Sequence, residues 1–229
     1  MRRFSVASVL VCSTVLAGCA GSPRPGPAAT TSTQTADTYD LIVRNGTLYD
    51  GTGTAGRRAD VGIRGDRVAS VGDLSGARAT TEIDAGGKAV APGFINVLSW
   101  ANESLIADGR AMSDLKQGVT LEIMGEGESG GPLNDAMKAD ILRHQGDIKY
   151  PIDWTTLGEF LDSLVRRGIS LNVASFVGAT SVRVHVLGED DRDPTPCELL
   201  QMQQLVRQAM REGALGVGSS LIYAPAFFA

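Results

Sequence analysis

The chain is poor in the residue types on which many metal, disulfide and nucleic-acid sites depend. Its 229 residues include three cysteines, two histidines and only 5% aromatic residues. His144 and His185 are far apart in the sequence, so we do not expect them to bind one zinc ion together. The formal net charge is −5, with no run of basic residues beyond the N-terminus. This charge argues against a nucleic-acid partner, because phosphate binding needs clustered positive charge.

The N-terminus is typical of an exported protein. Two arginines precede an apolar stretch, residues 4–16, which is too short to span a bilayer as a helix. The sequence "LAGC" at residues 16–19 then resembles the lipobox of bacterial lipoproteins, in which the chain is cut before the cysteine and the cysteine is acylated. We therefore predict a lipoprotein signal peptide at residues 1–18 and lipidation of Cys19. An ordinary secretory signal peptide is the alternative.

Only one cysteine is left in the region that we expect to fold. Cys12 lies in the predicted signal peptide and Cys19 would carry lipid, so Cys197 has no intrachain disulfide partner, and we expect a packed thiol. Residues 19–38 are rich in Pro, Ser, Thr and Ala without an apolar period, which predicts a disordered tether. Together these features predict a protein of the bacterial cell envelope that is held at the membrane by its N-terminal lipid.

The first folded segment, residues 39–91, consists of short β-prone runs separated by turn residues. Asn45-Gly46, Gly65-Asp66 and Gly86-Gly87 are each flanked by such runs, which predicts three hairpins. We therefore expect a small antiparallel β-sandwich module here.

After Pro92 the pattern changes to apolar strands alternating with helices, which predicts an α/β fold with a covered parallel sheet. Capping boxes at Thr156 and Thr195 mark the starts of two helices, and Gly168 and Gly213 mark their ends. The strand candidates are residues 94–98, 120–124, 170–177 and 214–222. A complete eight-stranded (β/α) barrel takes about 250 residues, so we expect residues 92–229 to be the N-terminal half of a barrel in a truncated chain.

Five stretches in order resemble the amidohydrolase superfamily, and within it the N-acyl-D-amino-acid deacylases (D-aminoacylases). They are "YDLIVRNGTLYDGTG", "IDAGGKAVAPGFIN", "LKQGVTLEIMGEG", "NVASFVGATSVR" and "AMREGALGVGSSLIYAP". The resemblance implies a distorted (β/α)8 barrel with a β-sandwich beside it. It also implies zinc-assisted hydrolysis of a carbon–nitrogen bond other than a peptide bond, in a small N-acyl amino acid or related amide.

The resemblance fails at the metal positions. The histidine pair of the family, an HxH motif on the first barrel strand, falls on Leu98 and Trp100, and the cysteine ligand falls on Gly127. None of these side chains can bind zinc. Glu126, beside the cysteine position, is our candidate for a replacement metal ligand, and a solvated acidic loop is the alternative.

Polar residues at the predicted strand ends are candidates for binding a substrate without a metal. For Ser99 the alternative is that it caps the following helix. For the candidates on the fourth strand the alternative is that they only pack within the barrel. We expect Arg183 to be an exposed loop arginine rather than a substrate ligand. The substrate-binding candidates are Asn96, Ser99, Ser219, Ser220 and Tyr223.

Two classes of function remain open from the sequence. The first is a lipid-anchored amidohydrolase of the D-aminoacylase type. The second is a non-catalytic envelope binding lipoprotein, or an inactive fragment, that keeps the scaffold without the metal. The sequence names no catalytic residue.

Overall fold

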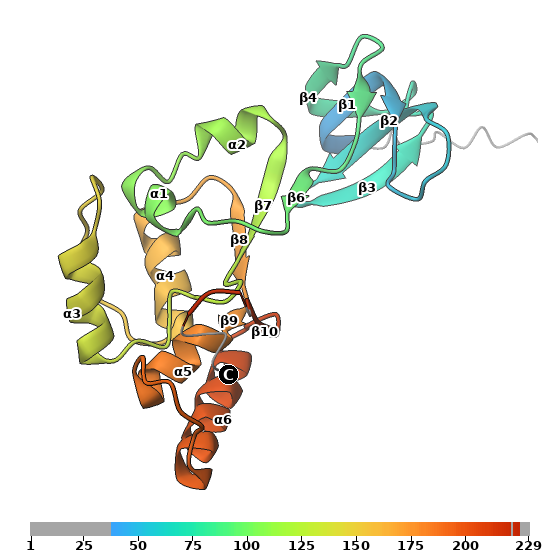
Figure 1. The fold of residues 1–229 in the computed structure, drawn as a ribbon. Helices are drawn as coiled ribbons and strands as arrows, with labels where there is room; N and C mark the ends of the chain where they lie inside the picture. The colour runs from blue at the N-terminus through green and yellow to red at the C-terminus, as the bar shows by residue number, and fades with distance from the viewer. Residues whose placement is uncertain (1–37, 221, 225–229) are drawn as a thin grey trace, which may run out of the picture.

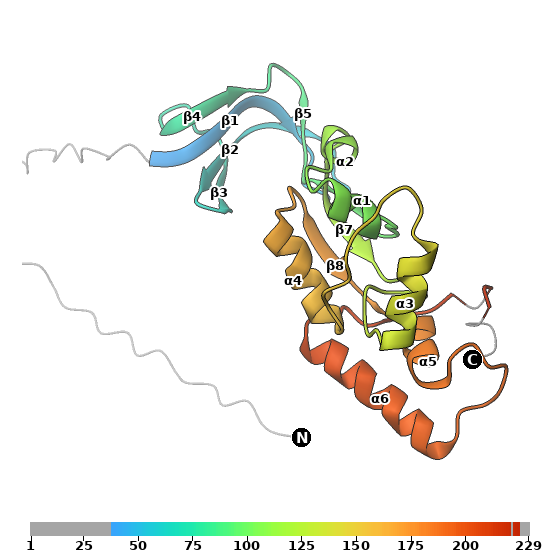
Figure 2. The same cartoon turned by 90° about the vertical axis from the view of Figure 1, so that its left-hand side faces the viewer.

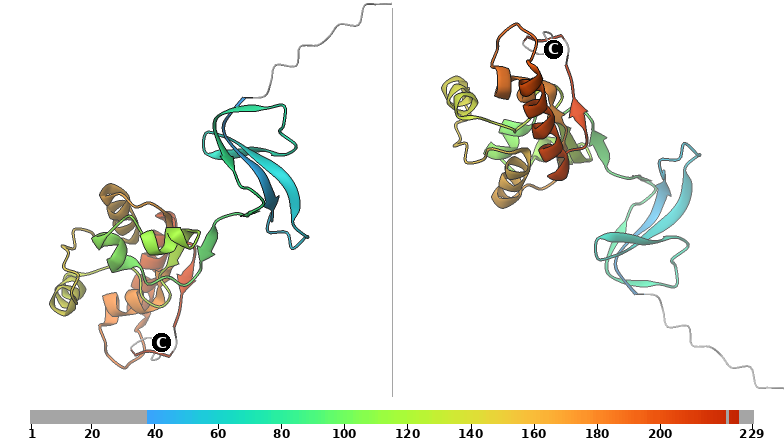
Figure 3. Two further views of the ribbon diagram at one scale, coloured as in Figure 1. Left: turned by 90° about the horizontal axis from the view of Figure 1, so that it is seen from above. Right: turned by 90° about the horizontal axis from the view of Figure 1, so that it is seen from below.

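The computed structural model describes residues 38–220 and 222–224, so the predicted signal peptide and almost all of the predicted tether lie outside the described residues. The described chain forms a sheet module and an α/β part. One segment, residues 91–93, joins strand β5 (Ala89–Val90) of the module to strand β6 (Phe94–Asn96) of the α/β part. Figures 1 and 3 show the two parts lying apart, with this connection between them.

The sheet module is a single five-stranded sheet. Besides β5 it contains β1 (Thr38–Leu48), β2 (Arg57–Arg64), β3 (Arg67–Gly72) and β4 (Arg78–Asp84). The strand order is β3-β2-β1-β4, with β5 also paired to β1, so β1 is central. The pairs β1–β2 and β2–β3 are antiparallel, as predicted, whereas β4 and β5 both run parallel to β1, and the sheet is therefore mixed.

Of the three predicted hairpins only the middle one forms. Gly65-Asp66 makes the tight turn between β2 and β3. Asn45-Gly46 lies inside β1, where Asn45 has a φ of 61° and the pairing register with β2 shifts. The side chain of Asn45 donates to Asp84 Oδ1 at 3.0 Å and its backbone N–H donates to Asp60 Oδ1 at 3.0 Å. Contacts with β2 and β4 thus hold Asn45-Gly46 in a β-bulge within one strand instead of a hairpin turn.

The third predicted hairpin, at Gly86-Gly87, is also wrong. Its flanking strands do not pair with each other but follow one another along β1. The backbone N–H of Gly87 donates to the carbonyl of Asn45 at 3.1 Å, so this segment crosses the bulge of β1 instead of reversing direction.

The α/β part is built on short parallel strands, as predicted. Strands β6, β7 (Val119–Met124) and β8 (Asn172–Ser175) form one parallel sheet, and β9 (Val177–Gly178) and β10 (Val217–Gly218) form a parallel pair. The third predicted strand is interrupted at Phe176, and the described part of the fourth is reduced to β10. The helices are α1 (Asn102–Ala107), α2 (Met112–Lys116), α3 (Asp135–His144), α4 (Leu157–Arg167), α5 (Ala179–Leu187) and α6 (Pro196–Arg211).

The two predicted capping boxes start helices α4 and α6. The hydroxyls of Thr156 and Thr195 accept from the backbone N–H three residues later, and the glutamate at that position bonds back to the cap. Helix α4 ends at Gly168, as expected, and Gly213 follows the last turn of α6. Figure 2 shows α6 at the end of the α/β part that is remote from the sheet module. In the described chain no helix is long and apolar enough to cross a membrane.

Two expectations about single residues are wrong. Arg183 lies in helix α5 and is only 1% exposed; its guanidinium donates to the carbonyls of Asp190 and Arg192 at 2.8 and 2.9 Å. It therefore holds the loop after α5 instead of projecting from a loop. Cys197 lies in the first turn of α6 with its thiol exposed, because the apolar face of that helix is formed by other residues.

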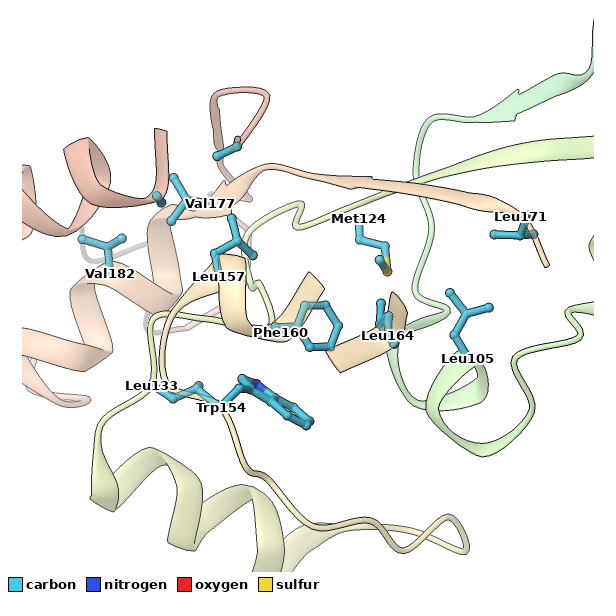
Figure 4. Packing of buried hydrophobic residues seen from close by; sticks show 12 residues of the cluster. Leu105, Met124, Leu133, Trp154, Leu157, Phe160, Leu164, Leu171, Val177 and Val182 are labelled. Atoms are coloured by element: carbon cyan, nitrogen blue, oxygen red, sulfur yellow. The ribbon is translucent and has the colours of Figure 1, made fainter. Parts of the chain in front are cut away.

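The core of the α/β part lies between the sheet and helix α4. Phe160 and Leu164 of α4 pack beside Met124 of β7, and the ring of Trp154 lies 5.4 Å from that of Phe160 (Figure 4). The indole of Trp154 donates to the carbonyl of Gly130 at 2.7 Å, so its polar atom is satisfied within the core. This packing fixes the end of β7 and the loop that follows it.

Candidate functional site

The loops that follow β7 and β10 meet at a pocket of about 170 Å³. The chain after β6 and the start of helix α5 close its remaining sides. The lining residues are Trp100, Glu126, Gly127, Glu128, Thr180, Ser220, Tyr223 and Ala224. The pocket therefore lies at the carboxyl ends of parallel strands, where α/β folds generally bind ligands.

A tight glycine-rich turn places the acidic side chains of this pocket. Gly125 and Gly127 have φ angles of 91° and 76°, which side-chain-bearing residues rarely adopt. The carbonyl of Glu126 accepts from the N–H of Glu128 at 2.9 Å, and the carbonyl of Gly127 accepts from the N–H of Thr180 at 2.9 Å. The turn is thus fixed by its own backbone and by the start of α5.

The structure brings together three of the residues that the sequence singled out. Glu126, Ser220 and Tyr223 all line the pocket. Ser219, the neighbour of Ser220, is exposed and does not line it. Thr180, which follows the third predicted strand, was missed by sequence reasoning, since a threonine at a helix start carries no distinctive signal.

Asn96 and Ser99 lie outside this pocket and are engaged with the protein itself. The side-chain amide of Asn96 donates to Glu122 Oε2 at 3.0 Å, and its oxygen accepts from the N–H of Leu98 at 3.3 Å. The hydroxyl of Ser99 is buried and accepts from the N–H of Ala101 at 3.2 Å, just before helix α1. Ser99 does not cap this helix through its side chain, because the N-cap of α1 is Ala101 and no side-chain cap hydrogen bond is present there.

Glu122 is the most deeply buried carboxylate near the strand ends. It is only 1% exposed, one oxygen is hydrogen-bonded to Asn96, and the other has no hydrogen-bond partner among the described residues. The pair joins β7 to the end of β6, and the N–H of Ser99 donates to the carbonyl of Ile123 at 2.9 Å beside it. These contacts fix the direction in which the chain leaves β6 toward Trp100.

The residues of this chain do not fit the zinc centre that the resemblance implies. The described residues contain no group of three or more His, Cys, Asp or Glu side chains that could hold a metal ion. Trp100 and Gly127, which the resemblance would place at ligand positions, carry no metal-binding atom in their side chains. A Cβ atom at Gly127 would lie 2.9 Å from Cβ of Ser220, so the place of a cysteine side chain is already filled.

The two histidines give no substitute for those ligands. His144 ends helix α3 and lies 3.3 Å from Asp140 Oδ1, while His185 lies on helix α5. Burial lowers the pKa of His185, which favours its neutral form. Neither histidine lines the pocket.

The chemistry of the pocket is acidic, aromatic and hydroxylic. Glu126 and Glu128 form no side-chain hydrogen bond or ion pair within the described residues, so their oxygens are free to meet a ligand. The hydroxyls of Thr180, Ser220 and Tyr223 provide donors and acceptors, and no lysine, arginine or histidine contributes to the lining. A larger groove of about 390 Å³ between α5, α6 and β10 is almost wholly apolar and contains none of the predicted site residues.

Comparison with known proteins gives relatives along most of the chain. No model of a known protein family matches it. D-aminoacylase of Alcaligenes xylosoxydans xylosoxydans is 36% identical over 192 residues, which cover 82% of this chain and 39% of that protein. N-acyl-D-glutamate deacylase of the same organism is 34% identical over 191 residues, covering 81% of this chain and 38% of the relative.

Solved structures agree with these relatives. A D-aminoacylase structure superposes with a TM-score of 0.72 at 35% identity, over 83% of this chain and 40% of that one. The N-acyl-D-glutamate deacylase of Bordetella bronchiseptica, solved with zinc and a phosphonate inhibitor, gives 0.73 at 30% identity, over 84% and 40%.

The chain thus spans about 40% of the length of the relatives it matches. The matched part covers most of the chain, while the HxH metal motif is absent from it. On this similarity of sequence and fold, the chain is a homologue of part of the N-acyl-D-amino-acid deacylases (D-aminoacylases) of the amidohydrolase superfamily.

Proposed function

We propose that this chain belongs to a hydrolase of the N-acyl-D-amino-acid deacylase type, which cleaves a carbon–nitrogen bond other than a peptide bond in a small N-acyl amino acid. The proposal includes export to the bacterial cell envelope and attachment to the membrane through lipid on Cys19. The 36% identity to D-aminoacylase over 82% of the chain supports the hydrolase. The "LAGC" sequence at residues 16–19 supports the lipid attachment.

The observation that carries the proposal is the pocket at the strand ends. It collects Glu126, Ser220 and Tyr223 from loops that are 94 or more residues apart in the sequence, at the edge where α/β enzymes bind their substrates. The hydroxyls of Ser220 and Tyr223 can donate to an acyl oxygen or a substrate carboxylate. The carboxylate of Glu126 can accept from an amide N–H.

Zinc is the cofactor that the family resemblance implies, and it would polarise the acyl carbonyl and activate water. The described residues contain no group of three or more side chains that could supply its ligands. The part that we assign to this chain is to bind and orient the N-acyl amino acid.

The alternative is a non-catalytic envelope binding lipoprotein or an inactive fragment. Leu98, Trp100 and Gly127, at the ligand positions of the family, favour it because none of them can bind a metal through its side chain. A binding protein would keep the pocket and its hydroxyls without turnover.

The two functions are separated by measuring turnover and binding on the same preparation. The chain is purified from bacterial membranes, and amine release is followed with N-acetyl-D- and N-acetyl-L-amino acids while binding is measured by titration calorimetry. Release from the D substrates supports the hydrolase, whereas binding without release supports the alternative. Absence of both refutes the hydrolase and the binding lipoprotein and supports an inactive fragment.

A matched pair of variants tests whether the pocket is the site. Ser220 lines the pocket and Ser219 does not, so S220A should weaken binding while S219A should leave it unchanged. Loss of one hydrogen bond of about 1 kcal/mol corresponds to roughly a fivefold change in Kd. Equal effects of the two variants would place the site elsewhere.

A further inference from the structure

The pocket combines two accessible aromatic rings with two carboxylates. Trp100 and Tyr223 are 61% and 65% exposed, so their ring faces are available to a ligand. Glu126 and Glu128 line the same pocket. An aromatic face attracts a cation through its quadrupole, and the carboxylates attract it through their charge, so all four side chains favour the same kind of ligand.

Among the described lining residues, no positively charged side chain neutralises the two carboxylates. The described lining contains no lysine, arginine or histidine, and neither carboxylate is paired with a basic side chain in the described residues. The chain as a whole also carries a net charge of −5. An anionic group in the pocket would be offset only by hydroxyl donors, whereas a cation would neutralise the two carboxylates.

The pocket is also poorly suited to a metal ion. Its polar lining atoms come from only two carboxylates and from hydroxyls, and the described residues form no three-ligand group. Trp100 contributes an aromatic ring to the lining and no metal-binding atom. A soft, weakly hydrated organic cation can use that ring, while a small divalent ion cannot.

We propose that this pocket binds an alkylammonium group, and that the substrate or ligand of the chain is an N-acyl amino acid with a basic side chain. The second half of this proposal rests on the function proposed above; the first half does not. It sets this chain apart from the N-acyl-D-glutamate and N-acyl-D-aspartate deacylases among its relatives, whose names specify acidic side chains.

The experiment compares ligands of different charge on the full chain. Tetramethylammonium, n-butylammonium, N-acetyl-D-lysine, N-acetyl-D-leucine and N-acetyl-D-glutamate are titrated by calorimetry at low and high salt. N-acetyl-D-lysine is expected to bind at least about tenfold more tightly than N-acetyl-D-glutamate, with the difference shrinking at high salt. Equal or tighter binding of N-acetyl-D-glutamate overturns the proposal.

Variants locate the effect in the pocket. W100L should weaken the binding of the ammonium probes by about three- to fivefold, and E126Q should do so by a similar factor. E189Q removes the same charge from an exposed glutamate outside the pocket and serves as the matched control. If W100L and E126Q bind the ammonium probes as tightly as E189Q does, the proposal is wrong. Circular dichroism identifies any variant that fails to fold, and the salt dependence of the unaltered chain then still decides.

The result separates this inference from the proposed function. Hydrolysis of N-acetyl-D-amino acids without a preference for positive charge overturns the cation site and leaves the hydrolase standing. Ammonium binding without hydrolysis supports the cation site and overturns the proposed hydrolase. Displacement of the ammonium probes by stoichiometric Zn²⁺ or Ca²⁺ would show a metal site instead and would also overturn the proposal.

Discussion

Gly127 offers the sharpest test of the close approach between the loops that follow β7 and β10. Its φ of 76° lies in the left-handed region, and a Cβ atom there would lie 2.9 Å from Cβ of Ser220. The backbone conformation alone costs a non-glycine residue roughly 1–2 kcal/mol. The contact with Ser220 adds an overpacking cost of about 1–3 kcal/mol.

We therefore expect G127A to lower the free energy of unfolding by about 2–5 kcal/mol, the sum of these two costs. Gly168 provides the control, because its φ is 85° and a Cβ atom there would meet nothing within 4 Å. G168A should lower the free energy of unfolding only by the backbone cost, about 1–2 kcal/mol. The difference between the two variants measures the contact with Ser220.

The assay is urea denaturation followed by the fluorescence of Trp154, which is 4% exposed in the core of the α/β part. The double variant G127A/S220G should recover the contact cost, giving a coupling energy of at least about 1 kcal/mol. A G127A variant that is no less stable than G168A, or a coupling energy near zero, would refute the close approach of these loops.

Three further predictions concern the helix ends and the N-terminus. T156A removes the cap of helix α4 and should lower the free energy of unfolding by about 1 kcal/mol in urea denaturation; an unchanged midpoint would contradict the capping box. Hydrogen bonding to Arg192 lowers the pKa of Glu198 from 4.5 to about 2. Its contribution to stability is therefore present above pH 4.5 and lost as the pH falls toward 2, and E198Q should flatten the stability–pH curve in that window. C19A should abolish incorporation of labelled palmitate and release the protein from the membrane fraction, whereas unchanged labelling would exclude lipidation at Cys19.

Local signals in the sequence located several elements correctly because their causes are local. A capping box needs only a Thr and a Glu three residues apart, so the starts of α4 and α6 follow directly from the sequence. The turn at Gly65-Asp66 likewise depends on its own backbone. Helix α5 was not predicted, because its alternating apolar residues are typical of a strand; in the structure it is a helix that packs against α6.

The hairpin signals show that residues distant in the sequence can decide the conformation of a turn-like segment. Asn45-Gly46 has the composition of a hairpin turn, yet Asp60 and Asp84 bind Asn45 within a continuous strand. Arg183 is comparable, since nothing nearby in the sequence indicates that two loop carbonyls will hold its buried guanidinium. In each case the deciding partners come from another strand or loop.

The sequence by itself determined the similarity to the D-aminoacylases, the alternation of strands and helices after Pro92 and the absence of the HxH motif. These properties depend on residue identity and order. Tertiary structure alone decided which candidates share a site, because convergence of loops that are distant in the chain depends on packing. It placed Glu126 and Ser220 with Trp100 around one pocket and tied Asn96 to a buried carboxylate outside it.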